Sequence, residues 1–245
     1  MCTRIVGLAL GRGQLLPRLC LTILTNVEEL ALARWVEKRL RGLYGEASFG
    51  DQDPLETLVA TILSQNTSDT NSGRAYASLL TRFGTLDRVR TAPVAEIARA
   101  IRIGGLHQAK ARAIKEVLRR ILRQRARLDL SFLADLSLEE ARAWLLASPG
   151  VGDKTAGIVL LFSLGKPYFP VDTHVRRVAT RLGVITGKGD PHREMNALLP
   201  KDPALMANLH VHLVAHGRKV CHSRGPECER CVLASRCRFA QATDA

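Results

Sequence analysis

Residues 146–156 read Leu-Ala-Ser-Pro-Gly-Val-Gly-Asp-Lys-Thr-Ala, a turn with two glycines that leads directly into an apolar helix. Gly150 and Gly152 allow a sharp turn and a close approach of the backbone to a partner. Backbone N–H groups at the start of the next helix can bind a phosphate, helped by the positive end of the helix dipole. The stretch predicts a hairpin between two helices that can bind a nucleic-acid backbone. An ordinary connection between helices is the alternative.

The chain around this hairpin has the spacing of amphipathic helices. Glycines and prolines divide the sequence after Val27 into about ten short segments, and no alternating strand pattern occurs there. Asp53 and Pro54 supply an N-cap and a first turn for one helix. Its apolar positions repeat at helical spacing: Leu55, Leu58, Val59, Ile62 and Leu63. The second set with this spacing is Ile114, Val117, Leu118, Ile121 and Leu122. The sequence therefore predicts an all-α fold.

The chain is strongly basic, with 36 Lys and Arg against 23 Asp and Glu among 245 residues, a net charge of +13. Such a balance indicates a polyanionic partner, nucleic acid before an anionic membrane. No apolar run is long enough to span a bilayer, so no membrane segment is expected. Eight basic residues lie between 110 and 127, and we expect them to form a solvated helix face, because no aromatic residues interleave with them as in a DNA-contacting stripe.

Residues 1–26 carry three arginines among apolar residues but lack a cleavage site of small residues. A disordered extension is predicted there in preference to a targeting segment. Cys2 and Cys20 lie in this region, and we interpret them as free thiols of a cytosolic protein.

Four further cysteines, Cys221, Cys228, Cys231 and Cys237, close the chain with six, two and five residues between them. A thiolate quartet binds an iron-sulfur cluster or a zinc ion. Structural zinc usually takes paired short knuckles, and only Cys228 and Cys231 form one here. The irregular spacing favours an iron-sulfur cluster over zinc or disulfides.

Asp172 follows Lys154 by eighteen residues. A helix from Lys154 to Leu164 advances about 16 Å, and the return to Val171 can span about 23 Å. The chain can therefore bring Asp172 back to the level of Lys154. Asp172 also precedes Thr-His-Val-Arg-Arg-Val, where it is suited to cap a helix.

These features together resemble the endonuclease III family, bifunctional DNA glycosylases of the helix-hairpin-helix superfamily. The similarity runs from about Val27 to Phe239. It includes residues 63–69, residues 105–111, the hairpin with Lys154, residues 171–175, and His216-Gly217-Arg218 before the cysteines.

The resemblance implies two helical domains with the active site in the groove between them. A six-helix barrel would comprise residues 54–166, with the helix-hairpin-helix near residues 146–156. Residues 27–53 and 167–245 would form a discontinuous domain around one 4Fe-4S cluster. Lys154 and Asp172 would then lie on opposite walls of the groove.

The resemblance also implies that the chain removes oxidised pyrimidines from damaged double-stranded DNA and cleaves the strand at abasic sites. Lys154 would form a Schiff base with the sugar, and Asp172 would stabilise the cationic sugar and assist proton transfer. Action as a monomer is expected, in the cytoplasm with the nucleoid if the chain is bacterial or archaeal. The DNA-binding residues implied are Gly150, Val151, Gly152, Gln65, Asn66, Leu106, His107, His174, Arg218, Lys219 and Arg224.

The target base must leave the stack, so side chains must fill the gap. The resemblance implies Leu106 as a wedge, although a buried hydrophobe after a Gly-Gly turn is an alternative. Gln65 and Asn66 are implied as the plug, and Asn66 departs from the glutamine that many relatives carry there. Arg224, with Arg218 and Lys219, is predicted to form a phosphate clamp in the cysteine loop.

Two other functions are compatible with parts of the sequence. An adenine-mismatch glycosylase shares the cysteine spacing but lacks a lysine where Lys154 stands. A noncatalytic DNA-binding module would keep the hairpin and the cysteines for scaffolding. His210, His212 and His216 lack the glutamate of a zinc-protease helix, so no metal role is predicted for them.

Overall fold

The computed structural model describes residues 18–47 and 52–243, which form helices and connecting loops with no strand among them. Of the predicted disordered extension, residues 1–17 lie outside this description. Residues 18–26 belong to the first helix, so the prediction is wrong for them. The longer helices are α1 (Arg18–Tyr44), α2 (Pro54–Ser64), α3 (Asp69–Phe83), α6 (His107–Arg125), α7 (Leu138–Leu146), α9 (Thr173–Leu182), α10 (Pro191–Leu198) and α11 (Pro203–Lys219). The shorter ones are α4 (Leu86–Thr91), α5 (Val94–Ala100), α8 (Asp153–Ile158) and α12 (Arg238–Thr243).

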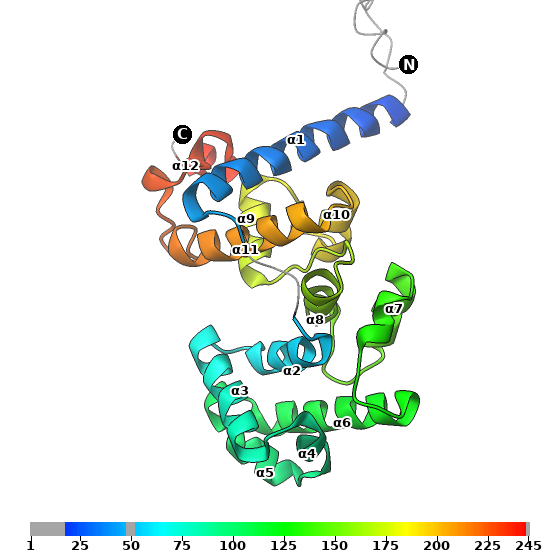
Figure 1. Ribbon diagram of the computed structural model, residues 1–245. Coiled ribbons are helices and arrows are strands. Elements are labelled where there is room, and N and C mark those ends of the chain that lie inside the picture. Colours follow the sequence, from blue (N-terminus) through cyan, green and yellow to red (C-terminus); the bar gives the residue numbers. More distant parts are fainter. Residues whose placement is uncertain (1–17, 48–51, 244–245) are drawn as a thin grey trace, which may run out of the picture.

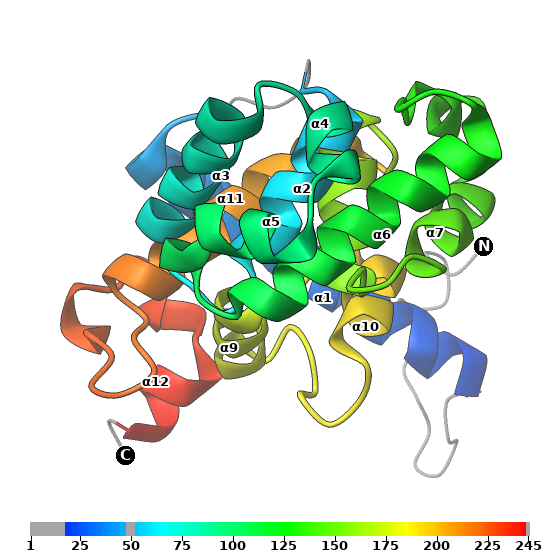
Figure 2. The same ribbon diagram turned by 90° about the horizontal axis from the view of Figure 1, so that it is seen from below.

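One lobe of the molecule contains helices α2 to α8 around an aliphatic core (Figure 1). The predicted apolar positions of α2 and α6 are buried in it, except that Leu122 is only partly buried. Asp53 caps α2 as predicted, because its Oδ1 accepts hydrogen bonds of 2.8 Å from the N–H groups of Leu55 and Glu56. Figure 2 views this lobe from below, with α6 packed beside α5.

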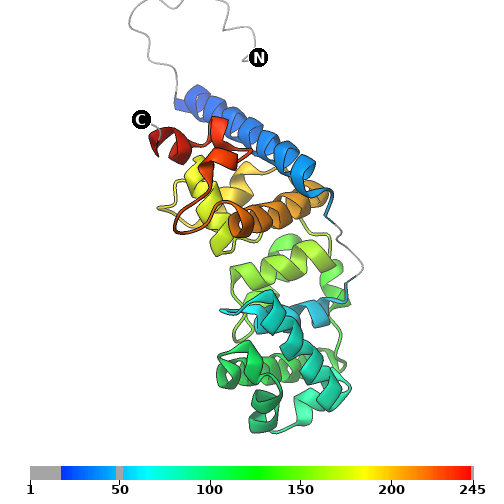
Figure 3. The ribbon, with the colours of Figure 1, turned by 90° about the vertical axis from the view of Figure 1, so that its left-hand side faces the viewer.

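The second lobe combines the two ends of the described chain: α1 packs on α10 and α11, and α9 packs on α11 and α12 (Figure 3). After α1, the next residue of its core is Leu161, in the middle of a π-helical segment, Val159–Ser163, that continues α8. The lobe thus gathers side chains from before residue 45 and after residue 160. In the part of the chain that the structure describes, no helix has both the length and the hydropathy needed to cross a bilayer.

The basic residues of α6 do not all face solvent as predicted. Lys110 and Lys115 are buried, and their Nζ atoms donate hydrogen bonds to backbone carbonyl oxygens. Arg120 is partly buried and donates to the carbonyl of Trp144, over whose ring its guanidinium lies. The prediction is wrong for these three residues, because carbonyls from distant segments replace water around their charges. The exposed ones are Arg112, Arg119, Arg123, Arg125 and Arg127.

The predicted hairpin connects α7 to α8. Gly150 has a φ of +76°, and a Cβ there would come within 2.9 Å of the Cβ of Ala113, so the turn requires glycine. Gly152 has an extended backbone and open space around it, so neither its backbone conformation nor a close neighbour requires glycine at this position. The turn thus packs tightly against α6 and leaves its outer side, at Gly152, open.

Candidate active site

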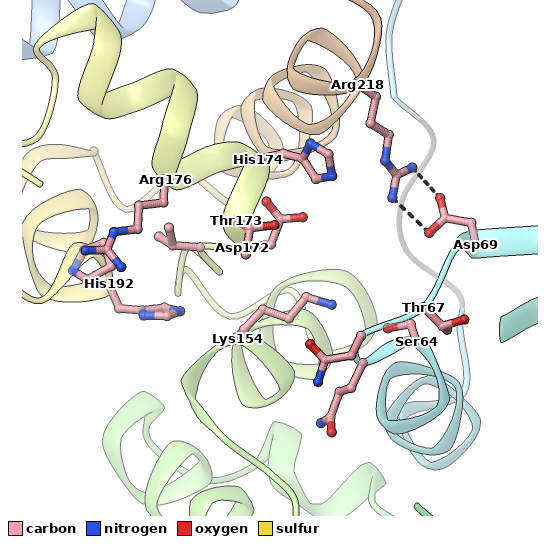
Figure 4. Close-up of a pocket in the computed structure, with 14 residues that line it drawn as sticks. Ser64, Thr67, Asp69, Lys154, Asp172, Thr173, His174, Arg176, His192 and Arg218 are labelled. Atoms are coloured by element: carbon pink, nitrogen blue, oxygen red, sulfur yellow. Dashed lines mark hydrogen bonds and ion pairs between the residues drawn. The ribbon is translucent and has the colours of Figure 1, made fainter. Parts of the chain in front are cut away.

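A cavity of about 550 Å³ opens in the groove between the lobes (Figure 4). The first lobe contributes the loop after α2 and the start of α8, and the second lobe contributes α9, α10 and the end of α11. The cavity is lined by Ser64, Gln65, Asn66, Thr67, Asp69, Lys154, Val171, Asp172, Thr173, His174, Arg176, Pro191, His192 and Arg218. The structure therefore brings together six of the residues predicted from the sequence: Gln65, Asn66, Lys154, Asp172, His174 and Arg218.

Lys154, in the first turn of α8, points its amine into the cavity (Figure 4). Burial lowers the pKa of Lys154 below its ordinary value, since it removes water from the charged amine. Asp172 and Asp69 raise this pKa, and Arg218 lowers it, without reversing the net direction. The site therefore increases the fraction of neutral amine, which is the nucleophilic form of a lysine.

Asp172 caps α9, as predicted, and lies on the opposite wall of the cavity from Lys154 (Figure 4). Its Oδ1 accepts a hydrogen bond of 2.8 Å from the N–H of Val175, which fixes the direction of the carboxylate. The helix that carries Lys154 and the segment before Asp172 come close together at Gly157, where an added Cβ would lie 2.9 Å from the Cβ of Pro170. A side chain at Gly157 would push the segment before Asp172 away from α8, so this glycine is needed for the juxtaposition.

An ion pair between Asp69 and Arg218 crosses the groove beside Lys154 (Figure 4). Asp69 begins α3 in the first lobe, and Arg218 lies near the end of α11 in the second. The guanidinium contacts both carboxylate oxygens, one of them at 2.9 Å. The sequence predicts Arg218 as a DNA contact but does not mark Asp69, because the partners are 149 positions apart in the chain.

The two residues predicted to fill a gap in DNA differ in their surroundings. The amide nitrogen of Gln65 donates to the carbonyl of Gly150 at 2.9 Å and to the hydroxyl of Thr155 at 3.3 Å. Asn66 is exposed at the cavity and has a φ of +52°. Gln65 is thus tied to the hairpin and to α8, which leaves Asn66 as the exposed member of the pair.

Several predicted DNA-binding residues lie outside the cavity. Leu106 is 56% exposed at the start of α6, next to the half-buried His107. Lys219 lies over the ring of Tyr44, and Arg224 is exposed in the cysteine loop. The hairpin residues Gly150, Val151 and Gly152 are also separate from the cavity, but they adjoin α8, which carries Lys154.

Histidines of the second lobe are mostly engaged within the protein. His174 Nδ1 lies 3.0 Å from Arg177 Nη2, which also donates to the carbonyl of Gly217. His210 is buried, with Nδ1 2.9 Å from the carbonyl oxygen of Pro170, just before the Asp172 turn. Burial lowers the pKa of His210 to about 4, so its imidazole is neutral near pH 7. His210 therefore serves as an uncharged support for the wall that carries Asp172.

A polar cluster next to Lys154 is not predicted from the sequence. Asp153 accepts hydrogen bonds from Arg142 on α7 and, at 2.8 Å, from the hydroxyl of Tyr168. His192 on α10 stacks on the ring of Tyr168. The cluster connects α7 and α8 with the segment that crosses to the second lobe. No local pattern in the sequence marks it, because its members lie on four separate segments.

The four predicted cysteine ligands gather around one part of the second core. Burial raises the pKa of the Cys231 thiol, and the other three cysteines raise it further, so the four sulfur atoms lie within electrostatic reach. Arg181 Nη1 donates to Cys221 Sγ at 3.3 Å, and His216 Nε2 lies 3.4 Å from Cys231 Sγ. Buried or partly buried thiols with a cationic donor nearby suit a group that binds them as thiolates. Within the described residues, no three His, Cys, Asp or Glu side chains are grouped so as to bind a single metal ion.

Comparisons with known proteins agree with this geometry. Residues 59–202 match the family described as HhH-GPD superfamily base excision DNA repair protein. Endonuclease III of Sulfolobus acidocaldarius is 38% identical over 75% of this chain and 81% of its own, and that of Escherichia coli K12 is 31% identical over 78% and 86%. A solved structure of a trapped endonuclease III–DNA covalent intermediate, an estranged-adenine complex, has a TM-score of 0.73 and 26% identity, covering 88% of this chain and 99% of that one.

The fold and the site define a DNA glycosylase of base excision repair, with the all-α architecture of the helix-hairpin-helix superfamily. Within that class, the chain belongs to the endonuclease III family. The resemblance found in the sequence is therefore confirmed.

Proposed function

We propose that this chain removes oxidised pyrimidines from double-stranded DNA and cleaves the strand at the resulting abasic site through a Schiff base on Lys154. The observation that carries the proposal is the amine of Lys154, which points into the cavity, faces Asp172 and has a lowered pKa. Both side chains come from the same chain, so a monomer suffices. The similar solved structures, described as complexes of endonuclease III with DNA, support DNA as the substrate.

The chemistry begins when the neutral amine of Lys154 attacks C1′ of the damaged nucleotide and the base leaves with its bonding electrons. Asp172 stabilises the positive charge that develops on the sugar and helps to move the proton that the amine loses. Opening of the sugar ring gives a protonated Schiff base between Lys154 and C1′. Loss of a proton from C2′ then expels the 3′ phosphate by β-elimination, and water hydrolyses the Schiff base to free Lys154.

The DNA would be held by residues on both lobes. The hairpin residues Gly150, Val151 and Gly152 supply backbone N–H groups for a phosphate, and Leu106 and Asn66 enter the duplex beside the flipped nucleotide. Basic and polar side chains around the groove contact the backbone: His107, His174, Arg218, Lys219 and Arg224.

Cys221, Cys228, Cys231 and Cys237 would hold one 4Fe-4S cluster as a structural group. The donor from Arg181 to Cys221 Sγ, and His216 Nε2 at 3.4 Å from Cys231 Sγ, fit thiolate ligands. The cluster would order the loop that carries Arg224, and the base-excision chemistry on Lys154 does not involve it.

The test separates base release from strand cleavage on a duplex that contains one thymine glycol. Wild type gives both products, and Lys154→Gln lowers strand cleavage by about 10³-fold or more, since no Schiff base forms. Lys38→Gln, an exposed lysine on α1, is the matched control and cleaves like wild type. Base release without strand cleavage by wild type would support a monofunctional glycosylase, and release of neither product would support a noncatalytic module.

A further inference from the structure

Two loops beside the cavity each carry a residue other than glycine in the left-handed region of the backbone. Asn66 has a φ of +52° after α2, and Leu106 has a φ of +48° before α6. This conformation is unfavourable for side chains with a Cβ, so contacts elsewhere must impose it. Leu106 and Ile103 are also exposed apolar residues, 56% and 38% accessible. The loops thus present strained, protruding side chains that need external support.

Lys110 connects the two loops from inside the first lobe. Its side chain is buried, with the residue only 3% exposed, and Nζ donates to Leu63 O at 2.7 Å and to Gly104 O at 2.8 Å. Leu63 lies three residues before Asn66, and Gly104 lies two residues before Leu106. One ammonium group therefore holds the carbonyls at the base of both loops. Burial lowers the pKa of Lys110, but two carbonyl acceptors offset part of the lost hydration.

Gln65 connects the first of these loops to a third segment. Its amide nitrogen donates to Gly150 O in the hairpin and to Thr155 Oγ1 on α8. Thr155 directly follows Lys154. The loop at Asn66 is thus bonded on one side to the loop at Leu106 and on the other to the helix that carries the nucleophile.

We propose that Lys110 and Gln65 are positioning residues that join the Asn66 loop, the Leu106 loop and the hairpin into one rigid unit, which keeps the duplex open beside Lys154. The inference rests on the proposed function, because it assumes that a nucleotide leaves the stack. Extruding a nucleotide from a duplex has a free-energy cost, and the base stack tends to close again. The side chains that replace the nucleotide must therefore keep their positions in the stack. Two loops that move independently would let the strand close again.

Lys115 offers a matched control on the same helix. It too is a buried lysine, 8% exposed, and its Nζ donates to the carbonyl of Ala92 between α4 and α5. Neither Lys115 nor Ala92 lines the cavity. Lys115→Met therefore removes a buried ammonium group at a similar structural cost without disconnecting the loops.

The experiment compares single-turnover cleavage of the same abasic strand in two duplexes. One has an intact complement, and the other has a gap opposite the abasic site, so no base must be displaced. We expect Lys110→Met and Gln65→Ala to slow cleavage of the intact duplex by about 10- to 100-fold, but that of the gapped duplex by less than about twofold. Lys115→Met is expected to leave the ratio of the two rates as in wild type.

A second readout reports opening without cleavage. 2-Aminopurine placed opposite an uncleavable tetrahydrofuran site becomes brighter when wild type or Lys115→Met binds, and we expect a smaller rise with Lys110→Met and Gln65→Ala. If Lys110→Met does not fold, as circular dichroism would reveal, the partly exposed Gln65 carries the test alone. Equal slowing on both duplexes, or none, would overturn the inference and leave the lyase intact. A wild-type chain that cleaves neither duplex would overturn both.

Discussion

The two lobes bury different kinds of polar side chain. In the first lobe, the buried Lys110 and Lys115 donate to backbone carbonyls inside a continuous aliphatic core. In the second lobe, buried histidines and the cysteine quartet lie in a core assembled from both ends of the chain. The buried charges of the first lobe are thus satisfied by its own backbone, whereas the stability of the second lobe should depend on pH near neutrality and on the group that the cysteines bind.

Removing one cysteine ligand should give the largest difference between the lobes. In Cys231→Ser we expect most of the bound iron to be lost and Tm to fall by about 10 °C or more, because binding energy of a structural group is folding energy. Amide hydrogen exchange should rise in α9 to α12 and change little in α2 to α6. Cys20→Ser, outside the quartet, is the control for iron content. Full iron in Cys231→Ser would show that the quartet does not hold the group.

A smaller effect is expected from the buried His210, whose pKa falls from the ordinary 6.5 to about 4 because of burial. Between these pH values the unfolded chain binds the proton and the folded chain does not. The free energy of unfolding therefore decreases as pH falls from about 6.5 to about 4, by up to about 1.4 kcal/mol per pH unit for this proton. Denaturant titrations of wild type and His210→Gln should give a shallower pH dependence in the variant. The same pH dependence of the free energy of unfolding in wild type and variant would contradict a lowered pKa for His210.

The smallest effects concern the pKa of Lys154, which two charges of the second lobe, Asp172 and Arg218, shift in opposite directions. Asp172→Asn removes a charge that raises this pKa, so the pKa should fall further, while asparagine still caps α9. Arg218→Ala removes a charge that lowers it, so the pKa should rise. NMR titration of the ¹³C-dimethylated lysine measures both shifts. Shifts in the same direction would show that these two charges do not control the amine.

The sequence predicts the features of this fold that depend on local spacing. The apolar faces of α2 and α6 and the caps at Asp53 and Asp172 follow from patterns within a few residues. Chain geometry permits Asp172 to return to the level of Lys154. Their pairing in one site, and one 4Fe-4S cluster on the cysteine quartet, are implied by the resemblance to the endonuclease III family.

Features that depend on contacts between residues far apart in the sequence cannot be predicted from local spacing. The burial of Lys110 needs carbonyls at Leu63 and Gly104, and the position of Arg218 needs Asp69. The prediction for α6 placed every lysine and arginine in solvent because of its charge and the absence of interleaved aromatic residues, so it is wrong for the inner basic residues. The role of Gly157 likewise appears only when Pro170 packs against it.

The central claim is that Lys154 is the nucleophile, and borohydride trapping on abasic duplex DNA tests it most directly. Borohydride reduces a Schiff base to a stable amine, so wild type should form a covalent protein–DNA adduct whose cross-linked peptide contains Lys154. Lys154→Ala should form none, and Lys38→Gln should form as much as wild type. No adduct with wild type, or an adduct that persists in Lys154→Ala, would contradict the account.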